Sequence, residues 1–356
     1  MKVDIEKLDK NLVPSGNTSR EDAVFRSIRE EPFELYGMYD PRNQRPFVRI
    51  PKEVTDQVGW GYSLMNSMLA GARARFKTDS DYIILKVTTP SITPYTTGGT
   101  ITSMKGFDLY IKDDAGKERY YKSFRPPISF EEGYESIVEL PKGMKDITLY
   151  FPMYNQVDDV YVGLQEQAAL TEGSSYKYAK PVFVYGSSIT QGCCTSRCGN
   201  VYSSILGRML DANMWNFGAS GSAKGQIPTA EFIGEQDLAA FIYDYDHNAP
   251  NAAFLRDTHE KFFRVIRDKN PQLPVVFLSK PDSGDPERAE RKEIIRQTFL
   301  KAQAAGDENV YFIDGETLIV GEEGDIGMAD GTHPNDFGQL LMAKGIAPVL
   351  QEILEK

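Results

Sequence analysis

Residues 181–191, PVFVYGSSITQ, join a short apolar run to a glycine and two serines. Val182–Tyr185 has the β-branched and aromatic content of a buried strand. Because a helical pattern begins near Asn200, we expect a strand–turn–helix corner that holds Ser188 just beyond the carboxyl end of a central strand. Open α/β sheets bind their ligands at this edge. Ser188 is therefore a candidate nucleophile, although serine is also an ordinary turn residue.

From about residue 178 onward, strand-like runs alternate with helical stretches. Alternation of this kind predicts parallel strands covered by helices on both faces. We therefore expect residues 176–356 to form a three-layer α/β/α domain around a five-stranded parallel sheet. Its predicted strands are Val182–Tyr185, Met214–Phe217, Leu238–Tyr243, Pro274–Leu278 and Val310–Ile313.

The N-terminal half has a different pattern, in which short β runs are separated by turn residues. This spacing predicts an all-β sandwich or jelly-roll domain, which we place at residues 31–175. The polar residues 1–30 are expected to form an N-terminal arm. The predicted strands are Ala72–Phe76, Tyr82–Val87, Phe107–Lys112, Arg119–Phe124, Ser136–Leu140, Asp146–Phe151 and Val160–Leu164.

The charge balance narrows the classes of partner. The chain has 51 acidic and 40 basic residues and a formal net charge of −11, which disfavours nucleic acid and anionic membranes as partners. An uncharged small-molecule or oligosaccharide ester fits better. No apolar run is long enough to span a membrane, and the charged N-terminus lacks the apolar core of a signal peptide. We therefore expect a cytoplasmic protein, and the sequence does not exclude a homo-oligomer.

Three cysteines, Cys193, Cys194 and Cys198, follow the Ser188 turn. An odd number at this spacing resembles neither a disulfide framework nor the paired CxxC of a zinc site. We therefore expect reduced thiols, no metal and no cofactor. Because these cysteines lie near Ser188 in the sequence, a thiol reagent could still affect activity.

Polar or glycine-rich blocks follow four of the five expected strands, at residues 186–188, 216–225, 244–248 and 330–335. The carboxyl ends of parallel strands meet at one edge of a sheet, so we expect these blocks to lie together. Acyl transfer needs a nucleophile, a base, a group that orients the base and donors for an oxyanion. The blocks offer a candidate for each role, although each block could also be an ordinary turn or helix cap.

The chain has only three histidines, so few residues could act as the base. His259 falls inside a helical stretch, where we expect a surface or flanking position. His247 lies beside Asn248 and is an alternative base. His333 is preferred because Asp330, three residues earlier, could orient its imidazole.

The blocks GSSIT, NFGASG, DYDHN and DGTHPN, in this order, resemble those of the SGNH (GDSL-type) hydrolase superfamily. The sequence GFDLY at residues 106–110 resembles the GxDLY signature of an N-terminal β domain. This domain accompanies one branch of the superfamily, whose nucleophile block reads GxSI. The resemblance implies a flavodoxin-like SGNH domain in the C-terminal half. It also implies a catalytic triad with Ser188 as the nucleophile, completed by His333 and Asp330.

The resemblance further implies an oxyanion hole built from the N–H groups of Ser188 and Gly221 and the side-chain amide of Asn248. The third block lacks the usual GxND form, so Asn251 remains an alternative to Asn248. Ser187 stands where most relatives have Asp. A hydroxyl can replace some of the hydrogen bonding of a carboxylate.

Related enzymes with a β domain ahead of an SGNH domain often deacetylate carbohydrates. The resemblance therefore predicts a serine esterase that hydrolyses short acyl esters, such as acetyl groups on sugars, through an acyl-enzyme on Ser188. The aromatic residues Trp60, Tyr62, Tyr95 and Tyr110 could stack on sugar rings, although such residues more often belong to a core. A thioesterase or lysophospholipase is the alternative enzyme class, and a non-catalytic carbohydrate-binding protein is the alternative outside the enzymes.

Overall fold

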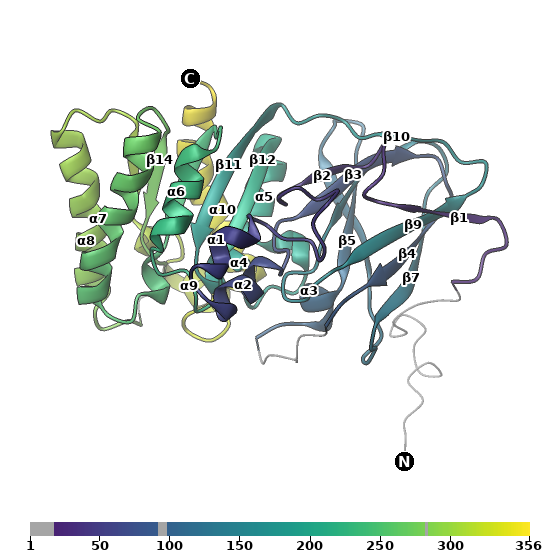
Figure 1. Ribbon diagram of the computed structural model, residues 1–356, viewed down its shortest axis with the longest axis horizontal. Coiled ribbons are helices and arrows are strands. Elements are labelled where there is room, and N and C mark those ends of the chain that lie inside the picture. The colour runs from purple at the N-terminus through teal and green to yellow at the C-terminus, as the bar shows by residue number, and fades with distance from the viewer. Residues whose placement is uncertain (1–17, 92–97, 282–283) are drawn as a thin grey trace, which may run out of the picture.

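The structure is a computed structural model that describes residues 18–91, 98–281 and 284–356. Its N-terminal half contains two antiparallel β sheets, and its C-terminal half contains one parallel sheet covered by helices. Figure 1 shows these two parts side by side, with the helices α7 (Ala252–Lys269) and α8 (Arg288–Ala304) at the end farthest from the β domain.

The parallel sheet has the strand order β12-β11-β13-β14-β15. The first strand of the domain therefore lies second in the sheet, which is the flavodoxin-like order. All five predicted runs overlap these strands, so the predicted α/β fold is confirmed. The strands are β11 (Tyr178–Gly186), β12 (Ala212–Gly218), β13 (Ala240–Asp244), β14 (Val275–Leu278) and β15 (Val310–Ile313).

Alternate residues of β11 face opposite sides of the sheet. Phe183 and Tyr185 pack in one cluster with residues of α6, α7 and α8, and Val182 and Val184 pack in another with α5 and α10. Because both faces of the sheet are covered there, the buried part of β11 is the unbroken apolar run VFVY at residues 182–185. The helices not yet given bounds are α5 (Tyr202–Leu210), α6 (Ile227–Glu235) and α10 (Asp336–Leu354).

The N-terminal half is an all-β sandwich, as predicted. One sheet has the order β1-β9-β4-β7, and the other has the order β10-β3-β8-β5-β6 with β2 paired to β3. Their inner faces enclose a separate apolar core. The strands are β1 (Ala23–Ser27), β2 (Glu34–Tyr36), β3 (Arg73–Thr78), β4 (Tyr82–Thr88), β5 (Phe107–Lys112), β6 (Glu118–Phe124), β7 (Gly133–Glu139), β8 (Lys145–Tyr150), β9 (Asp159–Gln165) and β10 (Leu170–Glu172).

The expected arm at residues 1–30 is too long, because β1 already pairs with β9 from Ala23 onward. This strand lies at the edge of its sheet, and Val24 and Phe25 are exposed. It therefore lacks the alternation of apolar and polar residues that reveals a half-buried strand in a sequence.

Short helices also interrupt the β domain. Helices α1 (Lys52–Asp56) and α2 (Trp60–Asn66) lie next to the α/β domain, where α1 contacts α6. Ile50 and Tyr62 consequently belong to the core of the α/β domain, although they lie within the sequence range of the β domain. A third short helix, α3 (Ile101–Lys105), precedes β5.

The remaining short elements lie around the loops of the α/β domain. They are α4 (Ser188–Gln191), α9 (Gly321–Gly327) and the 3-10 turns η3 (Cys198–Asn200), η4 (Asp246–Asn248) and η5 (Gly315–Thr317). Among the residues that the structure describes, none of the helices has the length and apolar content needed to cross a bilayer.

Candidate active site

Ser188 begins helix α4 directly after strand β11, at the corner expected from the sequence. Two glycines allow this helix to lie against the ends of the strands. A Cβ atom on Gly186 would overlap Thr190 Oγ1, and a Cβ atom on Gly218 would overlap the backbone of Gln191. The tight packing fixes the position of Ser188 at the carboxyl edge of the sheet, and its side chain is only partly buried.

Ser187 is fully buried and caps helix α4, because its Oγ accepts a hydrogen bond from the N–H of Ile189 at 3.2 Å. An N-cap needs only one acceptor oxygen, so a hydroxyl can replace the carboxylate at this position. Its burial and its bond to the backbone point Ser187 away from any substrate. Ser188, which is only partly buried, is thus the candidate nucleophile of the pair.

Ser188, His333 and Asp330 form a continuous chain of hydrogen bonds. Ser188 Oγ lies 2.8 Å from His333 Nε2, and His333 Nδ1 lies 2.8 Å from Asp330 Oδ2. The carboxylate fixes the proton on Nδ1, which leaves the Nε2 lone pair directed at the hydroxyl. The structure therefore brings together the three residues predicted as nucleophile, base and orienting group, although Asp330 lies 3 residues and Ser188 145 residues from His333 in the sequence.

The loop that carries His333 is closed by its own backbone bonds. The N–H of Ala329 donates to the carbonyl of His333 at 2.8 Å. Asp330 Oδ1 accepts from the N–H groups of His333 and Thr332 at 2.7 and 3.0 Å. The same carboxylate thus holds both the backbone and the ring of His333.

The charge of His333 depends on its neighbours. The Cys193 thiol beside the ring raises the pKa of His333 most strongly, burial lowers it, and Asp330 raises it further. The net effect is a raised pKa, which favours the imidazolium that forms when the ring takes a proton from Ser188. Burial raises the pKa of Asp330, but its hydrogen bonds from His333 outweigh this effect and lower it.

The residues predicted to form the oxyanion hole come from three loops at the same sheet edge. Asn248 ends the turn η4, and its Nδ2 donates to the carbonyl of Ala219 at 2.9 Å. This bond ties the amide to the loop that contains Gly221, whose φ of 64° favours glycine. The N–H of Ser188 lies in the first turn of α4, where an N–H has no carbonyl partner within its own helix.

Asn251, the alternative to Asn248, has a structural role. It caps α7, because its side chain accepts from the N–H of Phe254 at 2.8 Å. His247, the alternative base, lies in η4 beside Asn248. The histidine that contacts the Ser188 hydroxyl is His333.

His259 does not lie at the surface as expected, because it is fully buried on the inner face of α7. Its Nδ1 lies 2.9 Å from Thr298 Oγ1, and its ring stacks on Tyr243 at 4.4 Å. Burial lowers the pKa of His259 to about 3, so it is a neutral core residue.

The aromatic candidates for sugar binding divide into buried and exposed residues. Tyr62 is buried, and its hydroxyl lies 2.8 Å from Thr229 Oγ1, so its prediction as a stacking residue is wrong. Tyr110 is buried as well. Both lie on elements that pack against the α/β domain, which the sequence pattern did not reveal. Tyr95 lies outside the described residues.

Trp60 is 80% exposed and lines a cavity of about 400 Å³ together with Arg45, Leu64 and Gln156. The segment 153–156 connects this cavity to the candidate active site. The carbonyl of Met153 accepts from Gln191 Nε2 at 3.0 Å, and the hydroxyl of Tyr154 lies 2.7 Å from Ser220 Oγ, next to Gly221. Trp60 therefore remains a candidate for substrate contact.

Two buried glutamines that support the site were not predicted. Gln191 Oε1 accepts from the N–H and the hydroxyl of Ser220, both at 2.8 Å. Gln339 on α10 donates to the carbonyl of Ile189 at 3.1 Å and accepts from the N–H of Tyr202 at 2.7 Å. The sequence could have pointed to Gln339, because it is a polar residue on the inner face of an otherwise apolar helix. A buried polar residue of this kind must have hydrogen-bond partners.

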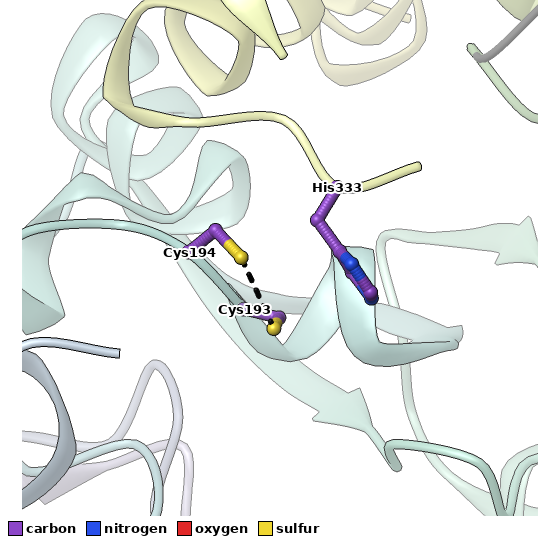
Figure 2. A group of neighbouring side chains, drawn as sticks. All are labelled: Cys193, Cys194 and His333. Atoms are coloured by element: carbon purple, nitrogen blue, oxygen red, sulfur yellow. Dashed lines mark hydrogen bonds between the residues drawn. The ribbon is translucent and has the colours of Figure 1, made fainter. Parts of the chain in front are cut away.

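The three cysteines are free, as expected. Cys198 is fully buried, whereas Cys193 and Cys194 are partly buried. The contact with Cys194 lowers the pKa of the Cys193 thiol more than burial raises it, and His333 lowers it further. Within the described part of the chain, these two thiols and His333 are the group of side chains arranged closely enough to hold a metal ion (Figure 2).

Comparisons with known proteins agree with this architecture. Residues 179–351 match the model of the GDSL-like lipase/acylhydrolase family, and residues 23–170 match the GxDLY model for the N-terminus of SGNH-hydrolase-type esterases. A search of curated protein sequences gives no significant match.

Several solved structures share the whole fold. A GDSL-like lipase from Bacteroides ovatus ATCC 8483 is 26% identical with a TM-score of 0.84, and the match covers 94% of this chain and 98% of that one. The salicylyl-acyltransferase SsfX3 from a tetracycline biosynthetic pathway is 17% identical with a TM-score of 0.75, covering 93% and 98%. The acetyl xylan esterase Est2A from the rumen bacterium Butyrivibrio proteoclasticus is 13% identical with a TM-score of 0.61, covering 94% and 99%. The chain therefore belongs to the SGNH (GDSL-type) hydrolase superfamily, in the branch that carries a GxDLY β domain ahead of the hydrolase domain.

Proposed function

We propose that this protein is a serine esterase that hydrolyses short-chain acyl esters, with O-acetylated carbohydrates as its substrate class. The observation that carries the proposal is the chain of two 2.8 Å contacts from Ser188 Oγ through His333 to Asp330. This geometry is that of an activated hydroxyl whose base is itself oriented by a carboxylate.

The mechanism proceeds in two steps. His333 Nε2 takes the proton of Ser188 as the hydroxyl oxygen attacks the ester carbonyl. The N–H groups of Ser188 and Gly221 and the amide of Asn248 stabilise the negative oxygen of the tetrahedral intermediate. The imidazolium then protonates the leaving alcohol, and water hydrolyses the acyl-enzyme with His333 again acting as the base.

The substrate class is supported by the similar structures and by the composition. Besides the acetyl xylan esterase, they include a family two carbohydrate esterase from Clostridium thermocellum in complex with cellohexaose. That structure is 12% identical with a TM-score of 0.59. The net charge of −11 also favours a neutral substrate over an anionic one. The exposed indole of Trp60 offers a flat apolar surface for a sugar ring.

A panel of substrates tests this proposal. Purified protein is assayed with p-nitrophenyl acetate, butyrate and octanoate, and then with acetylated xylan oligosaccharides, with released acetate as the second readout. The proposal predicts the highest kcat/KM on acetate among the aryl esters and release of acetate from the oligosaccharides. Equal or higher kcat/KM on octanoate would instead indicate the lysophospholipase type.

The two other functions predict different results. A thioesterase would hydrolyse acetyl thioesters with a higher kcat/KM than the matched oxygen esters. A non-catalytic carbohydrate-binding protein would bind the oligosaccharides, as measured by calorimetry, without turning over any ester.

A further inference from the structure

The loop after Ser188 places two thiols beside His333 (Figure 2). The Sγ atoms of Cys193 and Cys194 lie 3.5 Å apart. One donor atom from each cysteine and one from His333 all lie within 4.8 Å of one another. All three side chains are partly buried, so they are held in place but remain accessible to a small ion.

The backbone directs both thiols to the same side. Gly192, which follows the last residue of helix α4, has φ of 96°, and Cys194 has φ of 68°. Residues with a side chain rarely adopt this left-handed conformation. In an extended chain, by contrast, the side chains of neighbouring residues point to opposite sides. The N–H of Cys193 donates to the carbonyl of Ser188 at 2.9 Å, which ties the pair to the candidate nucleophile. Unfavourable backbone conformations of this kind collect at functional sites.

Two thiolates and one imidazole are a donor set that suits Zn²⁺. With Zn–S near 2.3 Å and Zn–N near 2.0 Å, a tetrahedral ion holds neighbouring donor atoms roughly 3.5 to 3.8 Å apart. The separation of 3.5 Å between the two sulfur atoms is already close to this value. Small side-chain rotations suffice to bring the imidazole nitrogen into place, because no pair of donors is farther apart than 4.8 Å. Three protein ligands leave the fourth position for water.

Asp330 supplies the support that a metal-bound histidine needs. Histidine ligands usually donate their second ring N–H to a carboxylate, which fixes the tautomer and the direction of the free lone pair. His333 Nδ1 has this partner in Asp330 Oδ2, at 2.8 Å. The remaining lone pair on Nε2 faces Ser188 Oγ, also at 2.8 Å. This nitrogen can serve the hydroxyl or a metal ion, but not both at once.

We propose that Cys193, Cys194 and His333 form an inhibitory site for one Zn²⁺ ion, which binds in competition with the hydrogen bond between Ser188 and His333. The ion takes the Nε2 lone pair and two thiolates, and each thiol still protonated releases its proton to solvent. No residue is oxidised, so a chelator reverses the binding. The inhibitory effect rests on the proposed esterase function, whereas the metal binding does not.

Cobalt titration tests the site without an activity assay. The full-length reduced protein is titrated with Co²⁺, and the thiolate-to-cobalt charge-transfer absorption is recorded before Zn²⁺ is added to displace the cobalt. We expect one Co²⁺ per chain in the wild type and a higher affinity in Ser188→Ala, because this variant lacks the hydroxyl that competes for His333 Nε2. Loss of a residue that only supports a metal ligand costs roughly 10- to 100-fold in metal affinity. Cys194→Ser and His333→Ala each remove a ligand itself, so each should weaken Co²⁺ binding by more than this.

Cys198→Ser is the matched control, because its sulfur lies near the carbonyls of Gly106 and Tyr150 rather than in the cluster. It should bind Co²⁺ as the wild type does. Absence of the charge-transfer band in the wild type, or wild-type affinity in Cys194→Ser, would overturn the proposed site.

The inhibitory effect is measured separately. Zn²⁺ should abolish hydrolysis of p-nitrophenyl acetate by the wild type, and a chelator should restore it. The Zn²⁺ concentration for half-inhibition should rise in Cys194→Ser when each rate is compared with that of the same variant without metal. Zinc binding with unchanged hydrolysis would overturn the inhibitory role. A wild type that binds Co²⁺ through these thiols but hydrolyses no ester would keep the metal site and refute the esterase function.

Discussion

The buried carboxylate of Asp108 accepts a hydrogen bond from the backbone N–H of Gly199, at 2.8 Å. Asp108 is the central residue of the GFDLY sequence in the β domain, and Gly199 lies in the loop that follows Ser188 in the α/β domain. Arg197 from the same loop lies 3.8 Å from the carboxylate. The sequence signature of the β domain thus marks the contact by which this domain fixes a loop of the candidate active site.

Asp108→Asn should loosen this contact. Asp108 also accepts from Ser123 Oγ at 2.6 Å, so the carboxylate has more donors than one amide oxygen can satisfy. We expect a loss of about 1 to 3 kcal/mol in the free energy of unfolding, because a buried donor is left without an acceptor. Denaturation in urea measures this loss, and kcat/KM should fall as the loop becomes less ordered.

The exposed Asp114, in the turn after β5, provides the matched control. Asp114→Asn should change neither stability nor activity by a measurable amount. Equal unfolding free energies for the two variants would contradict the role given to Asp108.

Asn248→Ala should lower kcat by about 100- to 1,000-fold with little change in KM, because the oxyanion forms only during the reaction. Steady-state kinetics on p-nitrophenyl acetate measures this effect. Asn251→Ala is the control, since it removes a helix cap worth about 1 kcal/mol and leaves the chemistry alone. An unchanged kcat in Asn248→Ala would remove this residue from the oxyanion hole.

Trp60→Ala should raise KM for an acetylated oligosaccharide by roughly 3- to 10-fold, the value of one stacking contact. KM for p-nitrophenyl acetate should stay unchanged, because a small aryl ester does not need the cavity beside Trp60. Ile128 is equally exposed and does not line this cavity, so Ile128→Ala should affect neither substrate. Equal effects of Trp60→Ala on both substrates would count against sugar stacking.

Stability should depend on pH through Asp244, at the end of β13. Burial raises the pKa of Asp244 to about 6, against the hydrogen bonds from Thr190 and Tyr202. A raised pKa means that the folded state holds a proton which the unfolded state loses near pH 4. The wild type should therefore lose stability relative to Asp244→Asn as pH rises from 4 to 7, by up to about 3 kcal/mol. Urea denaturation of both proteins across this range measures the difference, and a constant difference would contradict the raised pKa.

The strands of the α/β domain were predictable because their residues are buried on both faces and therefore read as continuous apolar runs. The position of Ser188 was predictable for a related reason. The run VFVY ends at Gly186, and a glycine at this place indicates a sharp turn just before Ser188. The partnership of Ser188 with His333 was predictable because the chain has only three histidines and because Asp330 precedes His333 by three residues.

What escaped prediction depends on contacts between distant segments. Tyr62 looked like a stacking residue because nothing in its own sequence reveals that α2 packs on the neighbouring domain. His259 looked exposed because a polar ring is rare on the inner face of a helix. The thiol pair at Cys193 and Cys194 had no recognisable metal spacing, since its third donor lies on another loop. In each of these cases the outcome depends on packing between segments that lie far apart in the sequence. Local patterns in one sequence do not reveal such contacts.

The identity of the nucleophile is the central claim, and the neighbouring serines allow a direct test. Ser188→Ala and Ser187→Ala are compared with the wild type for hydrolysis of p-nitrophenyl acetate, after circular dichroism shows that each variant is folded. We predict that Ser188→Ala falls to the background rate. Ser187→Ala should lose about 0.5 to 2 kcal/mol of stability with its cap yet keep measurable turnover. Hydrolysis that survives in Ser188→Ala and disappears in Ser187→Ala would contradict the account.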